Sequence, residues 1–214
     1  MRKGWLVLAG LAALAAAGPF TAAAGTLELG AKAPMTAVEM KSVDGSKTSI
    51  AKVAGKKGTL VIFTCNSCPW VKAWESRMVE IGNAYAKQDV GVILINPNDP
   101  SQQAEDGFEE MVARAKKHGM AFPYAVDATS EIARAFGATR TPEAFLFDAS
   151  GRLVYHGAID DNARKPDAVT ERYLAEALDA VVAGKDVPMA ETKALGCTIK
   201  FRAAKKEAAG KSAS

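Results

Sequence analysis

Two cysteines lie where an apolar segment gives way to a helical pattern. The segment spans residues 60–63 (Leu-Val-Ile-Phe), Cys65 and Cys68 follow, and Pro69 comes next. Further along, apolar side chains recur at helical spacing, at Trp74, Met78, Ile81 and Tyr85. Two cysteines three positions apart at a helix start can close a disulfide across one turn, and the positive end of the helix stabilises a thiolate. The pattern predicts a strand–turn–helix unit that carries a dithiol at the turn.

A structural disulfide is a weaker explanation for this pair. A bridge between residues three apart closes a very small loop and adds little stability. The chain has three cysteines, so a fully paired framework is impossible, and the third is Cys197. The residues therefore favour redox chemistry at Cys65 and Cys68.

The two ends of the chain carry their own patterns. Residues 1–24 begin with Arg2 and Lys3, continue with an apolar stretch and end in small residues, as a secretory signal peptide does. That stretch is shorter than the about 20 residues of a membrane span, so we expect no stable span after processing. The Lys- and Ala-rich segment 203–214 is predicted to be disordered. A leader of this kind places the protein in an exported compartment, the bacterial periplasm, where disulfides persist.

The net charge of the chain limits the classes of partner that it could bind. With 27 Lys and Arg against 24 Asp and Glu, the formal net charge is +3. A balance this close to neutral argues against nucleic acid as a partner.

Between the ends, helical and strand patterns are mixed in one domain. Asp44-Gly45 predicts a hairpin turn within residues 38–50. The other expected strands are 60–63, 90–95, 143–147 and 152–156, and the expected helices follow Cys68 and cover 108–118, 130–136 and 169–182. Such an order predicts an α/β fold.

Five segments together resemble a known family: 63–73, 122–127, 137–148, 153–161 and 191–200. The chain is similar to the exported thioredoxin-like proteins related to peroxiredoxins, the peroxiredoxin-like redoxin family. This resemblance implies a thioredoxin fold over residues 25–202, with a central mixed sheet flanked by helices and an N-terminal hairpin extension. It also implies thiol–disulfide exchange with protein or small-molecule disulfides and no cofactor, with client proteins and a separate, unidentified redox partner.

Thr141-Pro142 is the second functional element that the resemblance implies. In thioredoxin-fold proteins a cis peptide at this place leaves the backbone of the preceding residue exposed, where it can hydrogen-bond an incoming peptide. Cis peptides are otherwise costly except before proline. We therefore expect Thr141 and Pro142 to contact substrate. Arg140 is expected to attract an acidic substrate, to lower a cysteine pKa, or to be simply solvated.

The order of attack within the pair has two competing indications. In thioredoxins the first cysteine of the motif faces solvent and attacks, and the second resolves the mixed disulfide. By this resemblance Cys65 would attack and Cys68 would resolve. Pro69 opposes this, because proline favours the first helical position and would make Cys68 the N-cap. We expect Cys65 to attack first. Cys197 is a candidate third redox thiol, with a small packed residue as the alternative.

A copper-binding chaperone of the Sco type is the alternative function. Such proteins share the fold and combine Cys-x-x-x-Cys-Pro with a distant histidine, and soft thiolates suit Cu(I). Here the spacing is one residue shorter, and His156 is the candidate histidine. We expect no metal site as the leading interpretation. Asp160-Asp161 is interpreted as a turn and capping pair outside the site.

A peroxiredoxin-like antioxidant protein is a second alternative. Peroxiredoxins use Pro-x-x-x-Thr-x-x-Cys to bind peroxide. Counted back from Cys65, the threonine and proline places hold Ile62 and Gly58, and counted from Cys68 they hold Cys65 and Val61. The sequence therefore predicts slow peroxide reduction at most.

Overall fold

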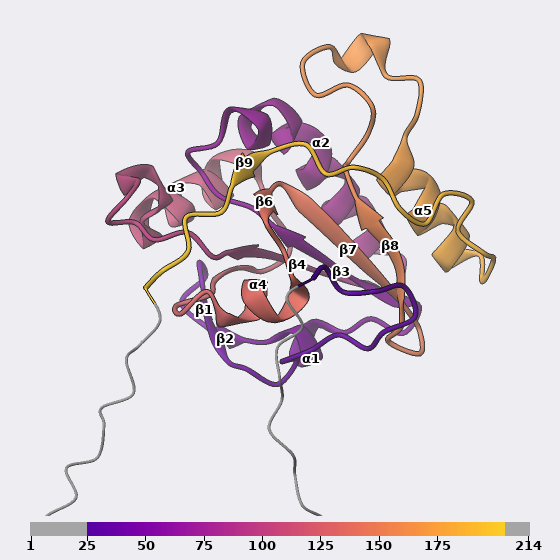
Figure 1. The fold of residues 1–214 in the computed structure, drawn as a ribbon, viewed down its shortest axis with the longest axis horizontal. Coiled ribbons are helices and arrows are strands. Elements are labelled where there is room, and N and C mark those ends of the chain that lie inside the picture. Colours follow the sequence, from indigo (N-terminus) through magenta and orange to yellow (C-terminus); the bar gives the residue numbers. More distant parts are fainter. Residues whose placement is uncertain (1–24, 204–214) are drawn as a thin grey trace, which may run out of the picture.

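The computed structural model describes residues 25–203, so the expected signal peptide 1–24 and nearly all of the expected tail 203–214 lie outside the described residues. Its main sheet has seven strands in the order β2-β1-β5-β4-β3-β7-β8 (Figure 1). Their bounds are β1 Met40–Ser42, β2 Lys47–Thr48, β3 Gly58–Phe63, β4 Val90–Asn96, β5 Tyr124–Val126, β7 Glu143–Asp148 and β8 Leu153–Gly157. β3 runs parallel to β4 and antiparallel to β7, so the sheet is mixed, as expected.

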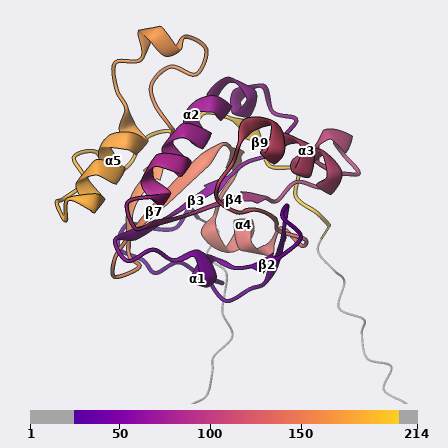
Figure 2. The ribbon, with the colours of Figure 1, turned by 180° about the vertical axis from the view of Figure 1, so that it is seen from behind.

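Helices cover both faces of this sheet. α2 (Pro69–Ala86), α3 (Phe108–His118) and α5 (Tyr173–Val182) contribute to one apolar cluster, and α1 (Ile50–Val53) and α4 (Glu131–Phe136) contribute to the other. Seen from behind in Figure 2, α2 and α5 lie side by side over the sheet, and the Tyr85 hydroxyl donates to the Ala175 carbonyl at 3.1 Å.

The interior strand β3 supplies side chains to both clusters. Leu60 and Ile62 face α2, whereas Val61 and Phe63 face α4, because successive side chains of a strand point to opposite faces. All six residues of β3 are buried. The uninterrupted apolar pattern of residues 60–63 is thus the signature of a strand covered on both sides.

The N-terminal hairpin is confirmed, and the structure adds its neighbour. β1 pairs antiparallel with β2 around Gly45, whose φ of 84° suits the expected turn. β1 also pairs with β5, so the hairpin forms one edge of the main sheet and does not stand apart from it.

The last helix differs from expectation at its start. α5 begins at Tyr173, while Val169 follows a short 3₁₀ helix, η2 (Pro166–Ala168). No helix within residues 25–203 combines the length and the apolar character that crossing a bilayer requires.

A second, two-stranded sheet was not expected. β6 (Arg140–Thr141) pairs antiparallel with β9 (Cys197–Thr198). In Figure 1 the segment after α5, drawn in gold and yellow, crosses the ends of β8 and β7 to reach β6. Its path is held by backbone contacts, since the amide of Thr192 donates to the carbonyl of His156 at 3.0 Å. The C-terminal segment therefore returns to the edge at which α2 begins.

Candidate active site

Cys68 is the N-cap of α2, with Pro69 at the first helical position. The preference of proline for this position is therefore confirmed. The sulfur of Cys68 lies beside the helix end where backbone amides lack partners within the helix. Its thiol donates to the carbonyl oxygen of Thr141, with the sulfur at 3.2 Å.

Cys65 lies in the loop between β3 and α2, and its sulfur is 3.1 Å from the hydroxyl oxygen of Thr141. The peptide bond between Thr141 and Pro142 is cis, as expected. Thr141 therefore contacts both cysteines, one through its hydroxyl and one through its carbonyl. β6 brings it there from 76 residues along the chain.

A buried carboxylate that the sequence did not indicate fixes the cysteine loop. Asp106, in the short 3₁₀ helix η1 (Ala104–Asp106), accepts hydrogen bonds from the backbone amides of Asn66 at 2.7 Å and Ser67 at 2.9 Å. It also accepts from the Ser67 hydroxyl and from the Asn98 side chain. Both residues between the cysteines are thus attached to η1.

Sequence reasoning missed Asp106 for a simple reason. Acidic residues are common at the start of a helix, and the sequence Glu105-Asp106-Gly107 stands directly before a helical pattern. Nothing local points to a loop 39 residues away.

The expectation that Cys65 faces solvent is wrong. Cys65 is 1% exposed and Cys68 is 2% exposed. The described space beside Cys65, lined also by Thr64, Met78 and Tyr124, has a volume of about 10 Å³. That is room for one water molecule at most. Differential exposure therefore gives no reason for Cys65 to attack first.

The two sulfurs differ in acidity instead. The pKa of Cys68 is lowered to about 5, mainly because the Cys65 thiol hydrogen-bonds its sulfur and also because Cys197 and the Val71 amide do, while burial acts in the opposite direction. The same hydrogen bond with Cys68, then burial, then the Asp106 carboxylate raise the pKa of Cys65. These pKa shifts favour a thiolate at Cys68 over one at Cys65, as the N-cap indication suggested, whereas the expected order of attack placed Cys65 first.

The third cysteine is brought to the same place. Cys197 lies opposite Thr141 in the β6–β9 pairing and packs against the cluster that contains Cys65 and Cys68. Burial, together with the neighbouring Cys68 sulfur, raises the pKa of Cys197 to about 11. Unlike the other two cysteines, Cys197 is only partly buried.

This segment also corrects the expectation for Thr141. Its backbone was expected to be exposed for an incoming peptide, but Thr141 is fully buried and its strand is paired with β9. Arg140 is exposed, and its guanidinium donates to the carbonyl of Gly196 at 3.0 Å. Arg140 thus holds the C-terminal segment and is not simply solvated.

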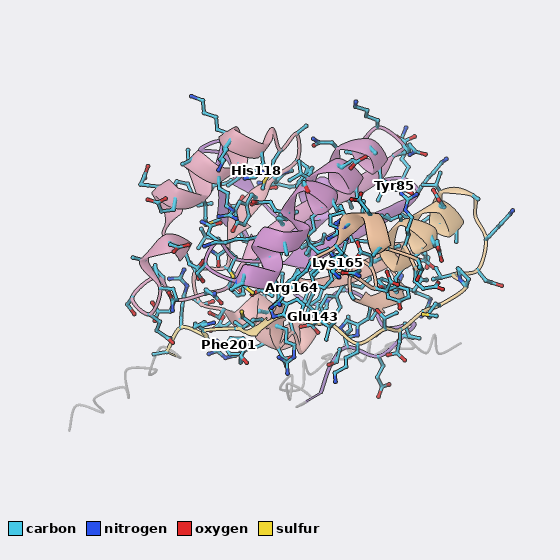
Figure 3. All side chains as sticks on the ribbon, turned by 90° about the horizontal axis from the view of Figure 1, so that it is seen from above. Tyr85, His118, Glu143, Arg164, Lys165 and Phe201 are labelled. Carbon is cyan, nitrogen blue, oxygen red and sulfur yellow. The ribbon has the colours of Figure 1, made fainter. Side chains whose placement is uncertain are left out.

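His156 is bound to a carboxylate rather than to the cysteines. Its Nε2 lies 2.7 Å from Glu143, the residue after the cis proline, and Glu143 also accepts from the amides of Thr139 and Arg140. Figure 3 labels Glu143 beside the yellow C-terminal segment. Within residues 25–203, no three His, Cys, Asp or Glu side chains are grouped in a way that could hold a metal ion.

The acidic pair Asp160-Asp161 lies at a turn beyond β8. Asp160 is buried and accepts from the indole Nε1 of Trp74 at 2.7 Å and from the guanidinium of Arg77. Asp161 accepts from the hydroxyl of Thr170. Both contacts fasten the β8–α5 connection, and neither involves a cysteine.

Comparison with known proteins agrees with this geometry. A solved hypothetical protein of Sinorhizobium meliloti 1021 is 35% identical, with a TM-score of 0.77 over 84% of this chain and 97% of the other. A secreted Mycobacterium tuberculosis disulfide oxidoreductase, homologous to DsbE of E. coli, is 17% identical, with a TM-score of 0.50 over 69% of this chain and 95% of the other. The latter likeness concerns the fold alone.

Among curated proteins, the thiol-disulfide oxidoreductase ResA of Geobacillus thermodenitrificans is 25% identical over 114 residues. The match covers 53% of this chain and 61% of ResA. The family model described as Redoxin matches residues 28–174, which is well over half of the chain. The chain therefore belongs to the Redoxin family and has the thioredoxin fold.

Proposed function

We propose that the protein catalyses thiol–disulfide exchange, with Cys68 as the attacking thiolate and Cys65 as the resolving thiol. The observation that carries this proposal is the position of Cys68 at the N-cap of α2, with the sulfurs of Cys65 and Cys68 both in contact with Thr141. Such a sulfur is ionised near neutral pH and has a second thiol in place to resolve a mixed disulfide. The name of the relative ResA and the Redoxin family support the same chemistry.

The exchange proceeds in two steps. The Cys68 thiolate attacks one sulfur of a client disulfide, a Cys68–client bond forms, and the other client sulfur leaves as a thiolate. Cys65, after losing its proton, then attacks the Cys68 sulfur. The Cys65–Cys68 disulfide forms and the second client thiolate leaves, so the client gains two electrons and the dithiol loses two. The reverse sequence transfers the disulfide to a client.

Thr141 contributes to both steps by position. Its carbonyl accepts from the Cys68 thiol before that sulfur loses its proton, and its hydroxyl contacts Cys65, so both sulfurs lie against one residue. We propose Thr141 and Pro142 as the residues against which a client peptide lies, once the C-terminal segment has moved.

The test is reduction of insulin by dithiothreitol in the presence of the full chain. The wild type is expected to accelerate the reaction, and Cys68→Ser is expected to lower the rate about a hundredfold, because the nucleophile is lost. Cys65→Ser combined with Cys197→Ser should accumulate a mixed disulfide at Cys68, visible as an added mass, because no second thiol is left to resolve it. A Cys68→Ser variant with the wild-type rate would refute the assignment, whereas a mixed disulfide at Cys65 in that variant would restore the first cysteine as nucleophile.

Export to the periplasm belongs to the same proposal. The pattern of residues 1–24 supports it, and an oxidising compartment suits a dithiol that cycles through a disulfide. Protein recovered from a periplasmic fraction is expected to begin at Gly25 by N-terminal sequencing. Recovery of the full-length chain in the membrane fraction would instead indicate an uncleaved anchor.

A further inference from the structure

The C-terminal segment occupies the edge at which a thioredoxin-fold protein is expected to receive a client peptide. β9 pairs antiparallel with β6, so that Cys197 lies opposite Thr141 and Thr198 lies opposite Arg140. The amide of Ile199 continues the pairing by donating to the carbonyl of Thr139 at 3.0 Å. The backbone before the cis proline is therefore already paired, within the same chain.

The docking is specific at the level of atoms. A Cβ on Gly196 would lie 2.3 Å from the carbonyl oxygen of Thr141, so only glycine permits this approach without a shift of the backbone. On the far side of Cys197, Ile199 is 4% exposed and packs in the apolar cluster of α4. The Lys200 amide donates to the Asn98 side chain at 2.9 Å. Cys197 is thus fixed from both sides.

This docking places three sulfurs around Thr141. Cys65 contacts its hydroxyl, Cys68 contacts its carbonyl, and Cys197 is its cross-strand neighbour. Cys68 and Cys197 both adjoin Thr141, and Cys197 packs against the apolar cluster that contains Cys68. Cys65 and Cys68 are buried, whereas Cys197 is partly exposed to solvent.

We propose that Cys197 is a third thiol of the exchange site and attacks Cys68 from the position of a client cysteine, so that the disulfide moves between Cys65–Cys68 and Cys68–Cys197. This inference rests on the proposed exchange function for its source of the first disulfide.

The step is an isomerisation that needs no further oxidant. Cys197 loses its proton and its sulfur attacks the Cys68 sulfur of the Cys65–Cys68 disulfide. The Cys68–Cys197 bond forms, the Cys65–Cys68 bond breaks, and the electron pair leaves on Cys65, which takes up a proton. The number of thiols and disulfides is unchanged.

The consequence is a change of access. A disulfide between Cys65 and Cys68 is enclosed, because both residues are at most 2% exposed. A disulfide between Cys68 and Cys197 includes a partly exposed sulfur, which the thiol of a redox partner or client can attack. The C-terminal segment would thereby pass oxidising equivalents between the enclosed pair and the surface.

The test uses full-length variants in which one of the three cysteines is replaced by serine. Each is oxidised with stoichiometric diamide at low protein concentration, quenched by alkylation and digested with trypsin. Cys65 and Cys68 fall in fragment 58–72, and Cys197 falls in fragment 194–200. Cys65→Ser is expected to give the two fragments joined by a disulfide. Cys68→Ser, which leaves Cys65 and Cys197, is expected to give about tenfold less of the joined fragments, because proximity and orientation favour a disulfide between Cys68 and Cys197.

Equal cross-linking in Cys65→Ser and Cys68→Ser would overturn the proposal, and so would disulfides in Cys65→Ser that join only separate chains. In the oxidised wild type, a fraction of fragment 194–200 should be joined to fragment 58–72, while Cys197→Ser should show none. Finding fragment 194–200 entirely alkylated in the oxidised wild type would contradict the relay.

A second pair of variants tests the docking without removing a sulfur. Adding Gly196→Ala to Cys65→Ser should slow cross-linking about tenfold, because the new Cβ displaces the segment from Thr141. Leu195→Ala is the matched control, since this neighbouring side chain is 38% exposed. An unchanged rate with Gly196→Ala would refute the docked geometry. Failure of the insulin assay with intact cross-linking would refute the exchange function and leave the Cys68–Cys197 contact standing.

Discussion

At the scale of single residues, Cys68 owes its acidity to neighbouring donors. Its pKa is about 5 against an ordinary 9.0, first because of the Cys65 thiol and to a smaller extent because of Cys197 and the Val71 amide. We expect alkylation of Cys68, normalised to its plateau, to be half-maximal near pH 5. Cys65→Ala should move this midpoint upwards more than Cys197→Ala does, since Cys65 is the main cause. Peptide mass after brief iodoacetamide treatment measures both.

The same residue links pH to stability. Because folding lowers the pKa of Cys68, its contribution to the free energy of unfolding is fully present above the ordinary pKa of 9.0 and is lost as the pH falls through about 5. The reduced wild type should therefore lose stability towards acid over this window more steeply than Cys68→Ser does. If the free energy of unfolding in urea fell with pH in the same way for both proteins, the thiolate would not form at Cys68. A midpoint for Cys68 alkylation near pH 9 would show the same.

At the scale of elements, the cysteine loop depends on η1. The Asp106 carboxylate accepts from two loop amides, and it raises the pKa of Cys65 after the effects of Cys68 and of burial. Asp106→Asn should lower the free energy of unfolding, measured in urea, by about 1–3 kcal/mol, because the new side-chain amide faces the Asn98 donor. It should also lower the pKa of Cys65, which thiolate absorbance measures.

Glu105→Gln is the matched control in the same turn. The Glu105 carboxylate pairs with Lys72 at 2.8 Å, but its side chain is 60% exposed. Exposed pairs contribute about 0–1 kcal/mol. If both variants lost the same stability and left the thiol titration unchanged, Asp106 would have no special part in holding the loop.

At the scale of the whole molecule, Cys65 and Cys68 belong to the apolar cluster on one face of the sheet, and the opposite face has a cluster of its own. Phe136 of α4 is fully buried, with ring centroids 5.2 Å from Phe63 and 5.3 Å from Phe145. Phe136→Ala should cost about 3–5 kcal/mol in urea unfolding. Leu29→Ala, at a side chain that is 42% exposed, should cost about 0.5 kcal/mol or less. If both variants lost a similar amount of unfolding free energy, Phe136 would not belong to the main stabilising core.

Much of the fold was readable from the sequence because its signals are local. The apolar run 60–63, the turn Asp44-Gly45 and the glycines after α3 and α4 act over a few residues, and the elements that they predict lie near their expected places. Val169 was misplaced, because its spacing fits a helix that a 3₁₀ turn in fact precedes. Residues of the site were nominated from the same local patterns, namely Cys-x-x-Cys and Thr-Pro.

The sequence by itself indicated the candidate site residues, Cys65, Cys68 and Thr141, and determined that Pro69 makes Cys68 the helix N-cap. Only the tertiary structure decided how they act together. Burial of Cys65, the attachment of its loop to Asp106 and the pairing of Cys197 with Thr141 join segments far apart in the chain. Acidity and access at a thiol depend on charges, donors and solvent that surround it in space, and spacing along a chain does not encode them.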